Sequence, residues 1–228
     1  MLTKEQLDEI TKQQKIKQNL FRSVPDSGKV IEYLGKEFIV YKNVFWPTDD
    51  SKALVENYNI NPGDDVLDVC TGCGVIAIIS AYKGAKKVVA LDISVDAIKA
   101  AKENVKRHGF VKTIDVRRSD VFSSLKDGEK FDVIIGNLPF KNMVAHDDAE
   151  ATFWDTNLEI QKKFFNNAHK YLKPNGRIYI SQSNYGAVDE MKQLAKKSGF
   201  YMKLIGEKTM PNNDPRVFYA FALSLSSK

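Results

Sequence analysis

Cysteine is scarce in this chain of 228 residues, which contains only Cys70 and Cys73. Two cysteines cannot build a disulfide scaffold, so we expect a reducing, cytoplasmic location. A metal site needs about four ligands, and a redox Cys-x-x-Cys pair needs a thioredoxin-like context that the flanking sequence lacks. The sequence therefore predicts no metal.

Long apolar runs are absent as well. No run approaches the ~20 residues of a membrane span, and the N-terminal residues are too polar for a signal peptide, so we expect no membrane partner. The formal charge of +5 is a mild basic excess. It permits nucleic acid or an acidic protein surface as partner but requires neither.

From residue 64 onward the sequence alternates between strand and helix patterns. Strands are predicted over residues 65–69, 87–91, 113–117, 132–135, 177–181, 200–206 and 217–223. Helices are predicted over residues 75–82, 94–108, 157–172 and 187–198. This order predicts an α/β fold with a doubly wound, mostly parallel sheet of seven strands. The last two strands are joined by a short turn region, so the final strand is predicted to be antiparallel.

The first 43 residues are predicted to form a helix and a β-hairpin. Thr3 and Gln6 have the spacing of a capping box for a helix over residues 3–21. Strands over residues 30–34 and 37–41 are expected to meet at a turn of Gly35 and Lys36. We expect this extension, residues 1–43, to lie on the substrate side of a main domain formed by residues 44–228.

The segment over residues 65–77 predicts a nucleotide site. A short apolar strand containing Asp68 leads into Thr71-Gly72-Cys73-Gly74 and then into an apolar helix. Glycine lets the backbone approach a ligand closely, and the N–H groups at the start of a helix favour a polar or anionic ligand.

Polar residues also follow the next three predicted strands. Asp92 and Ile93 come about twenty residues after the glycines, the spacing at which a carboxylate binds ribose hydroxyls. Asp120 and Val121 follow the third strand, and the tetrapeptide Asn137-Leu138-Pro139-Phe140 follows the fourth. Because ligands bind beyond the carboxyl ends of the strands in an open α/β sheet, these residues are expected to surround one site.

Three kinds of protein are compatible with this arrangement. A nicotinamide dehydrogenase would use Gly72-x-Gly74-x-x-Ala77 as its pyrophosphate turn. An S-adenosylmethionine methyltransferase would instead use Asp68 with the turn Thr71-Gly72-x-Gly74, and a binding scaffold would need no catalysis. The acid inside the first strand and the tetrapeptide after the fourth strand favour the methyltransferase.

Residues 66–76, 90–94, 119–122 and 131–140 resemble the successive motifs of class I S-adenosylmethionine-dependent methyltransferases, and the resemblance covers residues 45–223. The tetrapeptide resembles the (Asn/Asp)-Pro-Pro-(Tyr/Phe) signature of enzymes that methylate nitrogen on adenine, guanine or the glutamine side chain. Residues 44–51 are similar to the matching segment of the release-factor glutamine methyltransferases and their small-domain relatives. The resemblance implies a Rossmann-like methyltransferase fold over residues 44–228.

The resemblance also implies S-adenosyl-L-methionine as cofactor and methyl transfer to a planar amino or amide nitrogen. The acceptor is expected to be a macromolecule, either a protein glutamine or an RNA or DNA base, with a small metabolite as the alternative. The implied cofactor-binding residues are Asp68, Cys70, Thr71, Gly72, Gly74, Asp92, Ile93, Asp120, Val121 and Asn137.

The implied acceptor site is the tetrapeptide. The side-chain oxygen of Asn137 and the backbone carbonyl of Leu138 would accept the two hydrogens of the acceptor nitrogen and hold it in line with the methyl group. Pro139 would fix the backbone, and Phe140 would stack on the planar acceptor. Two departures from the family pattern are expected to affect the site: Leu138 replaces a proline, and Cys70 replaces a glycine.

Overall fold

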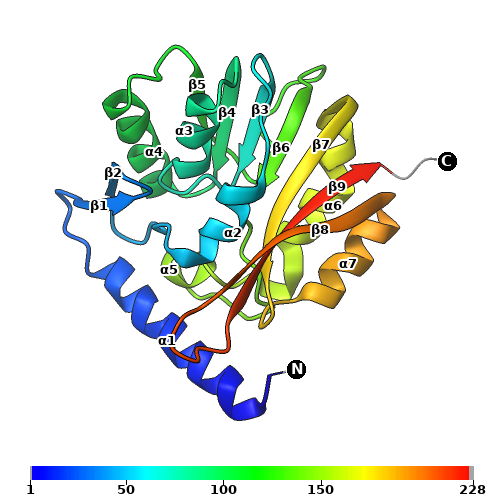
Figure 1. Cartoon of the computed structure of the whole chain (residues 1–228). Helices are drawn as coiled ribbons and strands as arrows, with labels where there is room; N and C mark the ends of the chain where they lie inside the picture. The colour runs from blue at the N-terminus through cyan, green and yellow to red at the C-terminus, as the bar shows by residue number, and fades with distance from the viewer. Residues whose placement is uncertain (1, 226–228) are drawn as a thin grey trace.

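A seven-stranded sheet forms the centre of the computed structural model, which describes residues 2–225 (Figure 1). Its strands are β3 (Asp65–Val69), β4 (Lys87–Asp92), β5 (Ile114–Arg118), β6 (Phe131–Gly136), β7 (Leu172–Ser183), β8 (Phe200–Thr209) and β9 (Val217–Leu225), in the spatial order β5-β4-β3-β6-β7-β9-β8. Strands β3 to β7 pair in parallel, whereas β9 is antiparallel to both of its neighbours. The predicted fold class, including the antiparallel last strand, is confirmed.

Helices cover both faces of the sheet. One face carries α2 (Asp49–Asn57), α3 (Val75–Tyr82) and α4 (Val95–Arg107), and the other carries α6 (Glu159–Tyr171) and α7 (Val188–Lys197). Successive strand residues point to opposite faces. Accordingly, Val66 belongs to the first apolar cluster and Leu67 to the second. Among residues 2–225, each helix is too short or too polar to span a bilayer.

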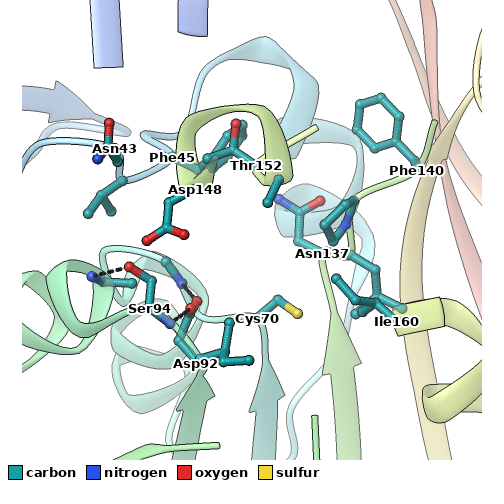
Figure 2. Close-up of a pocket in the computed structure, with 17 residues that line it drawn as sticks. Asn43, Phe45, Cys70, Asp92, Ser94, Asn137, Phe140, Asp148, Thr152 and Ile160 are labelled. Atoms are coloured by element: carbon teal, nitrogen blue, oxygen red, sulfur yellow. Dashed lines mark hydrogen bonds between the residues drawn. The ribbon is translucent and has the colours of Figure 1, made fainter. Parts of the chain in front are cut away.

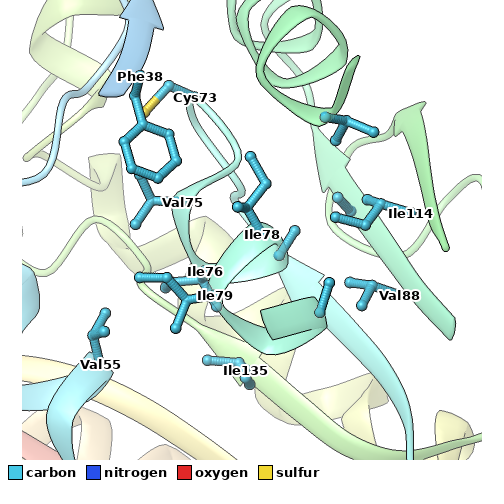
Figure 3. Close-up of a cluster of buried hydrophobic side chains, with 14 of the residues drawn as sticks. Phe38, Val55, Cys73, Val75, Ile76, Ile78, Ile79, Val88, Ile114 and Ile135 are labelled. Atoms are coloured by element: carbon cyan, nitrogen blue, oxygen red, sulfur yellow. The ribbon is translucent and has the colours of Figure 1, made fainter. Parts of the chain in front are cut away.

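Helix α3 lies deep inside the first cluster (Figure 3). All its residues from Val75 to Ala81 are buried, as expected for a helix that is apolar on every side. Phe38 of the N-terminal hairpin packs beside Cys73 and Val75. The glycine turn before α3 is therefore held by the core on one side and by the hairpin on the other.

The N-terminal helix and hairpin form as predicted, with one correction. Helix α1 (Lys4–Arg22) begins with the capping box of Thr3 and Gln6. Strands β1 (Lys29–Tyr33) and β2 (Lys36–Val40) pair one residue earlier than predicted. The turn consists of Leu34 and Gly35, which have φ of 51° and 69°, as a two-residue type I′ turn requires. The predicted turn of Gly35 and Lys36 is wrong because Leu34 adopts the left-handed conformation.

The segment after β6 departs most from prediction. A short helix, α5 (Asp148–Ala151), begins where the Asp147 side chain accepts a hydrogen bond from the backbone N–H of Glu150. The helix predicted over residues 157–172 begins later, because the 3-10 turn η1 (Thr156–Leu158) precedes α6 and places Asn157 and Leu158 at positive φ.

A buried asparagine on α4 joins the hairpin to the glycine turn. The Asn104 side chain on α4 accepts a hydrogen bond from the backbone N–H of Ile39 at 2.7 Å and donates to the carbonyls of Ile39 and Cys73, each at 2.8 Å. These bonds satisfy an amide that is fully buried. They also fix the hairpin against the glycine turn, so the first 43 residues help to position the site.

Candidate active site

A pocket opens at the carboxyl ends of β3, β4 and β6 (Figure 2). Most of the predicted site residues line it: Cys70, Gly72, Asp92, Ile93, Asn137, Leu138, Pro139 and Phe140. They come from separate segments of the chain that the parallel sheet brings to one edge.

Asp92 lies at the floor of the pocket and joins two loops. Its Oδ2 accepts the backbone N–H of Gly72 at 2.9 Å, and its Oδ1 accepts that of Ser94 at 3.0 Å. Burial raises the pKa of the Asp92 carboxyl, and the charge of Asp148 raises it further, whereas the backbone N–H donors lower it. Each carboxylate oxygen has a second lone pair available, which suits a ribose with two neighbouring hydroxyls.

Asp68 lies beneath the turn instead of lining the pocket. Its Oδ2 accepts hydrogen bonds from the Thr71 hydroxyl at 2.6 Å and from the backbone N–H of Ala77 at 3.1 Å. Its Oδ1 has no hydrogen-bond partner among residues 2–225. Complete burial raises the pKa of Asp68 to about 7, although the two donors lower it. Asp68 thus joins the end of β3 to the first turn of α3.

Four other predicted cofactor residues lie outside the pocket lining. Thr71 is buried, and its hydroxyl donates a hydrogen bond to Asp68. Gly74 begins α3 at φ 86°, and a Cβ there would lie 3.2 Å from the Ala101 Cα, so this glycine allows α3 and α4 to pack closely. The Asp120 carboxylate pairs with Lys163 Nζ at 2.6 Å, and Val121 is buried in the second apolar cluster. Direct contact of these residues with the cofactor stays a prediction.

The tetrapeptide is anchored by three neighbouring elements. The Ser181 hydroxyl on β7 donates to Asn137 Oδ1. Gln161 Nε2 on α6 donates to the Pro139 carbonyl at 3.1 Å, and the backbone N–H of Ala187 donates to the Phe140 carbonyl at 2.8 Å. Within residues 2–225, no backbone N–H donates to the Leu138 carbonyl. Acceptance of an N–H group of the acceptor by this carbonyl stays a prediction.

Phe140 does not face open space. Its side chain is 5% exposed, and its ring packs edge-to-face on Phe153 and Tyr185, with centroid distances of 6.4 and 5.5 Å. Stacking of this ring on an acceptor stays a prediction, and it requires the aromatic cluster to rearrange.

The rest of the pocket lining consists of residues that were not among the predicted site residues. These are Asn43, Val44, Phe45, Ser94, Ala97, Asp148, Ala151, Thr152 and Ile160. Phe45 could have been expected from its position just before the nucleotide unit. The α5 residues had only the acidic run over residues 147–150 as a signal, and α5 itself was not predicted.

The charged side chains that line the pocket are all negative. The lining contains the carboxylates of Asp92 and Asp148 and no lysine or arginine. In Figure 2 the Asp148 carboxylate lies above Ser94 and Asp92. Such a pocket attracts a cationic ligand and repels phosphate groups.

The site fits S-adenosylmethionine, which carries a positive sulfonium and a ribose. Asp92 offers acceptors to hydroxyl groups, Gly72 lets the backbone approach the ligand, and the orphaned Asp68 Oδ1 is a buried acceptor beneath the turn. The fold and this site together define a class I S-adenosylmethionine-dependent methyltransferase. The chain belongs to the methyltransferase small domain family, whose model matches residues 48–203.

Named relatives agree with this class. The chain is 32% identical over 183 residues to the release factor glutamine methyltransferase of Borreliella burgdorferi, covering 74% of the chain and 63% of that protein. It is 31% identical over 201 residues to a Methanocaldococcus jannaschii protein assigned as a protein N5-glutamine methyltransferase, covering 85% of the chain and 100% of that protein. The chain therefore spans less than two thirds of the bacterial relative and the whole of the archaeal one.

A solved structure shares the fold at lower identity. The 16S rRNA N2 methyltransferase of T. thermophilus, in complex with AdoMet and guanosine, superposes with a TM-score of 0.65 at 19% identity, covering 88% of this chain and 50% of that one.

Proposed function

We propose that the protein transfers a methyl group from S-adenosylmethionine to the side-chain amide nitrogen of a glutamine in an acceptor protein. The observation that carries the proposal is the pairing of Asn137 with the Leu138 carbonyl at the edge of a pocket without basic residues. Once the Asn137 carboxamide turns its oxygen toward the pocket, two acceptors at this point would match the two hydrogens of a primary amide. The glutamine methyltransferase names of the relatives from Borreliella burgdorferi and Methanocaldococcus jannaschii support the same acceptor.

The chemistry follows from the weak nucleophilicity of the acceptor. The nitrogen lone pair of an amide is delocalised into the carbonyl group, so the nitrogen attacks poorly unless it is oriented and its developing positive charge is stabilised. The Asn137 and Leu138 oxygens would orient the N–H bonds and stabilise that charge. When bound, S-adenosylmethionine supplies an electrophilic methyl group.

We also propose that residues 1–43 form part of the acceptor side. Helix α1 contacts the segment that follows the tetrapeptide, where Lys141 Nζ donates to the Thr11 hydroxyl at 2.5 Å and Trp154 Nε1 donates to Gln14 Oε1 at 3.2 Å. The free thiols of Cys70 and Cys73 support a cytoplasmic location for the protein.

A labelled-methyl assay tests the proposed acceptor. We expect transfer from S-[methyl-³H]adenosylmethionine to purified release factor or ribosomal protein, and none to ribosomal RNA or free glutamine. Asn137→Ala should reduce transfer by roughly a hundredfold or more, because the acceptor nitrogen is no longer oriented. Asn167→Ala, on α6 and outside the pocket lining, is the matched control and should retain wild-type activity. Label in RNA alone would contradict the proposal.

A further inference from the structure

Ser181 is the hydrogen-bond partner of the Asn137 side chain. It lies on β7, the strand next to β6, and its side chain is 5% exposed. Its hydroxyl donates to Asn137 Oδ1, and within residues 2–225 the Asn137 carboxamide has no other side-chain or backbone partner. The orientation of this amide therefore depends on one hydroxyl group from the neighbouring strand.

The carboxamide orientation differs from the one that the reaction needs. In Figure 2 the Asn137 nitrogen points to the side of Asp148 and Thr152, and the oxygen points away from them. To accept an N–H of the acceptor, the carboxamide must turn by half a rotation about its Cβ–Cγ bond. The amide nitrogen would then face Ser181.

We propose that Ser181 is a positioning residue that holds the Asn137 carboxamide in both orientations, an inference that rests on the proposed function. A hydroxyl both donates and accepts. Ser181 donates to Oδ1 in the present orientation and would accept from Nδ2 after the rotation. The rotation of the Asn137 carboxamide therefore leaves the Ser181 hydroxyl with a partner in both orientations. A buried polar group without a partner would cost stability.

The hydroxyl group acts on Asn137 and does not touch the acceptor. Ser181 is absent from the pocket lining, whereas Asn137 is part of it. The backbone on the far side of Asn137 is held independently, since Gln161 bonds the Pro139 carbonyl. Loss of the Ser181 hydroxyl should therefore free the carboxamide to rotate and leave the surrounding loop in place.

The same strand offers a matched control. Ser183 lies two positions further along β7, so it points to the same face of the sheet. It is fully buried, and its Oγ has no hydrogen-bond partner within residues 2–225. Ser183→Ala removes a buried hydroxyl from the same environment without affecting Asn137.

Nuclear magnetic resonance of the Asn137 side-chain amide tests the inference directly, with the resonance assigned by its loss in Asn137→Ala. We expect ¹⁵N relaxation of this amide to show a more mobile carboxamide in Ser181→Ala than in the wild type, because the carboxamide has lost its hydrogen-bond partner on β7. Ser181→Thr and Ser183→Ala should behave like the wild type. Equal mobility of the Asn137 amide in Ser181→Ala and Ser183→Ala would overturn the inference.

Kinetics provide the second measurement. With the protein acceptor of the labelled-methyl assay, Ser181→Ala should lower kcat by roughly ten- to a hundredfold, with the KM for S-adenosylmethionine unchanged and activity restored in Ser181→Thr. Calorimetric titration with S-adenosylhomocysteine should give equal affinities for all variants, which shows that the cofactor site is intact. If no acceptor is methylated by the wild type, the proposed function fails, and the resonance comparison still decides the role of Ser181.

Discussion

The buried carboxyl group of Asp68 makes the stability of the protein depend on pH. Its pKa is about 7 in the folded state against an ordinary value of 3.8, so the folded state binds more protons than the unfolded state between these values. The contribution of Asp68 to the free energy of unfolding is therefore highest below about pH 4, and it is lost as the pH rises through about 7. The full span corresponds to roughly 4 kcal/mol.

Asp68→Asn should remove this pH dependence. The asparagine oxygen can still accept hydrogen bonds from Thr71 and Ala77, and the side chain remains neutral at every pH. Urea unfolding at pH 5 and pH 8 measures the difference. The free energy of unfolding should fall with pH more steeply in the wild type than in Asp68→Asn, and equal slopes would show that Asp68 ionises normally.

Cys70 stores backbone strain at the head of the glycine turn. Its φ is 61°, a conformation that costs a residue with a Cβ about 1 kcal/mol. Cys70→Gly should therefore be more stable than Cys70→Ala by about 1 kcal/mol. At Cys73, which is buried in the core and is not among the positive-φ residues, the order should be reversed. Urea unfolding of the four variants checks this, and the same order at both positions would contradict the strain.

At the residue level, the sequence predicted the identity of the pocket residues better than their roles. Asp92, Gly72 and Asn137 line one pocket, because the carboxyl ends of parallel strands meet at one edge of the sheet. Asp68 lies beneath the turn, and Phe140 is buried among aromatic rings. The burial of Phe140 depends on Phe153 and Tyr185, which are distant in the sequence. No local sequence pattern predicts these contacts.

At the level of elements, Arg22 connects α1 to α5 above the pocket. Its Nε and Nη2 donate to the two Asp147 carboxylate oxygens at 2.9 and 3.0 Å, and Nη2 lies 3.5 Å from Glu150 Oε1. The guanidinium lowers the pKa of Asp147 through these hydrogen bonds. Since α5 contributes Asp148 to the pocket lining, this ion pair holds a wall of the cofactor site.

Arg22→Ala should loosen that wall with little effect on global stability. The pair is partly exposed, so its loss should lower the free energy of unfolding by about 1 kcal/mol or less. We expect faster hydrogen exchange over residues 147–152 and faster dissociation of S-adenosylhomocysteine, measured by stopped flow. Arg107→Ala is the control, because Arg107 pairs with Glu37 at 3.5 Å and does not line the pocket. Equal dissociation rates in the two variants would refute the coupling.

Helices and strands were easier to predict than the turns between them. Helix α3 has the predicted bounds, because a continuous apolar run between a glycine turn and Lys83 leaves little choice. The turn of the hairpin lies one residue earlier than predicted, because the left-handed conformation of Leu34 has no side-chain signature. Helix α5 has four residues, too few to produce a helical pattern in the sequence.

At the level of the whole molecule, the alternation of strands and helices was sufficient to predict the sheet and its antiparallel end. It was not sufficient to predict how α1 packs against the segment after the tetrapeptide. Those contacts join residues more than a hundred positions apart, such as Arg22 with Asp147 and Gln14 with Trp154. Their side chains form single contacts that have no periodic pattern in the sequence.

We propose that a glutamine amide nitrogen receives the methyl group at Asn137. This can be tested by tandem mass spectrometry of the acceptor protein after incubation with the enzyme and S-adenosylmethionine. We expect one added methyl group on the side-chain nitrogen of a glutamine with the wild type, and roughly a hundredfold less of it with Asn137→Ala after the same incubation time. A methyl group on any other residue type, or an equal yield with Asn137→Ala, would refute the proposal.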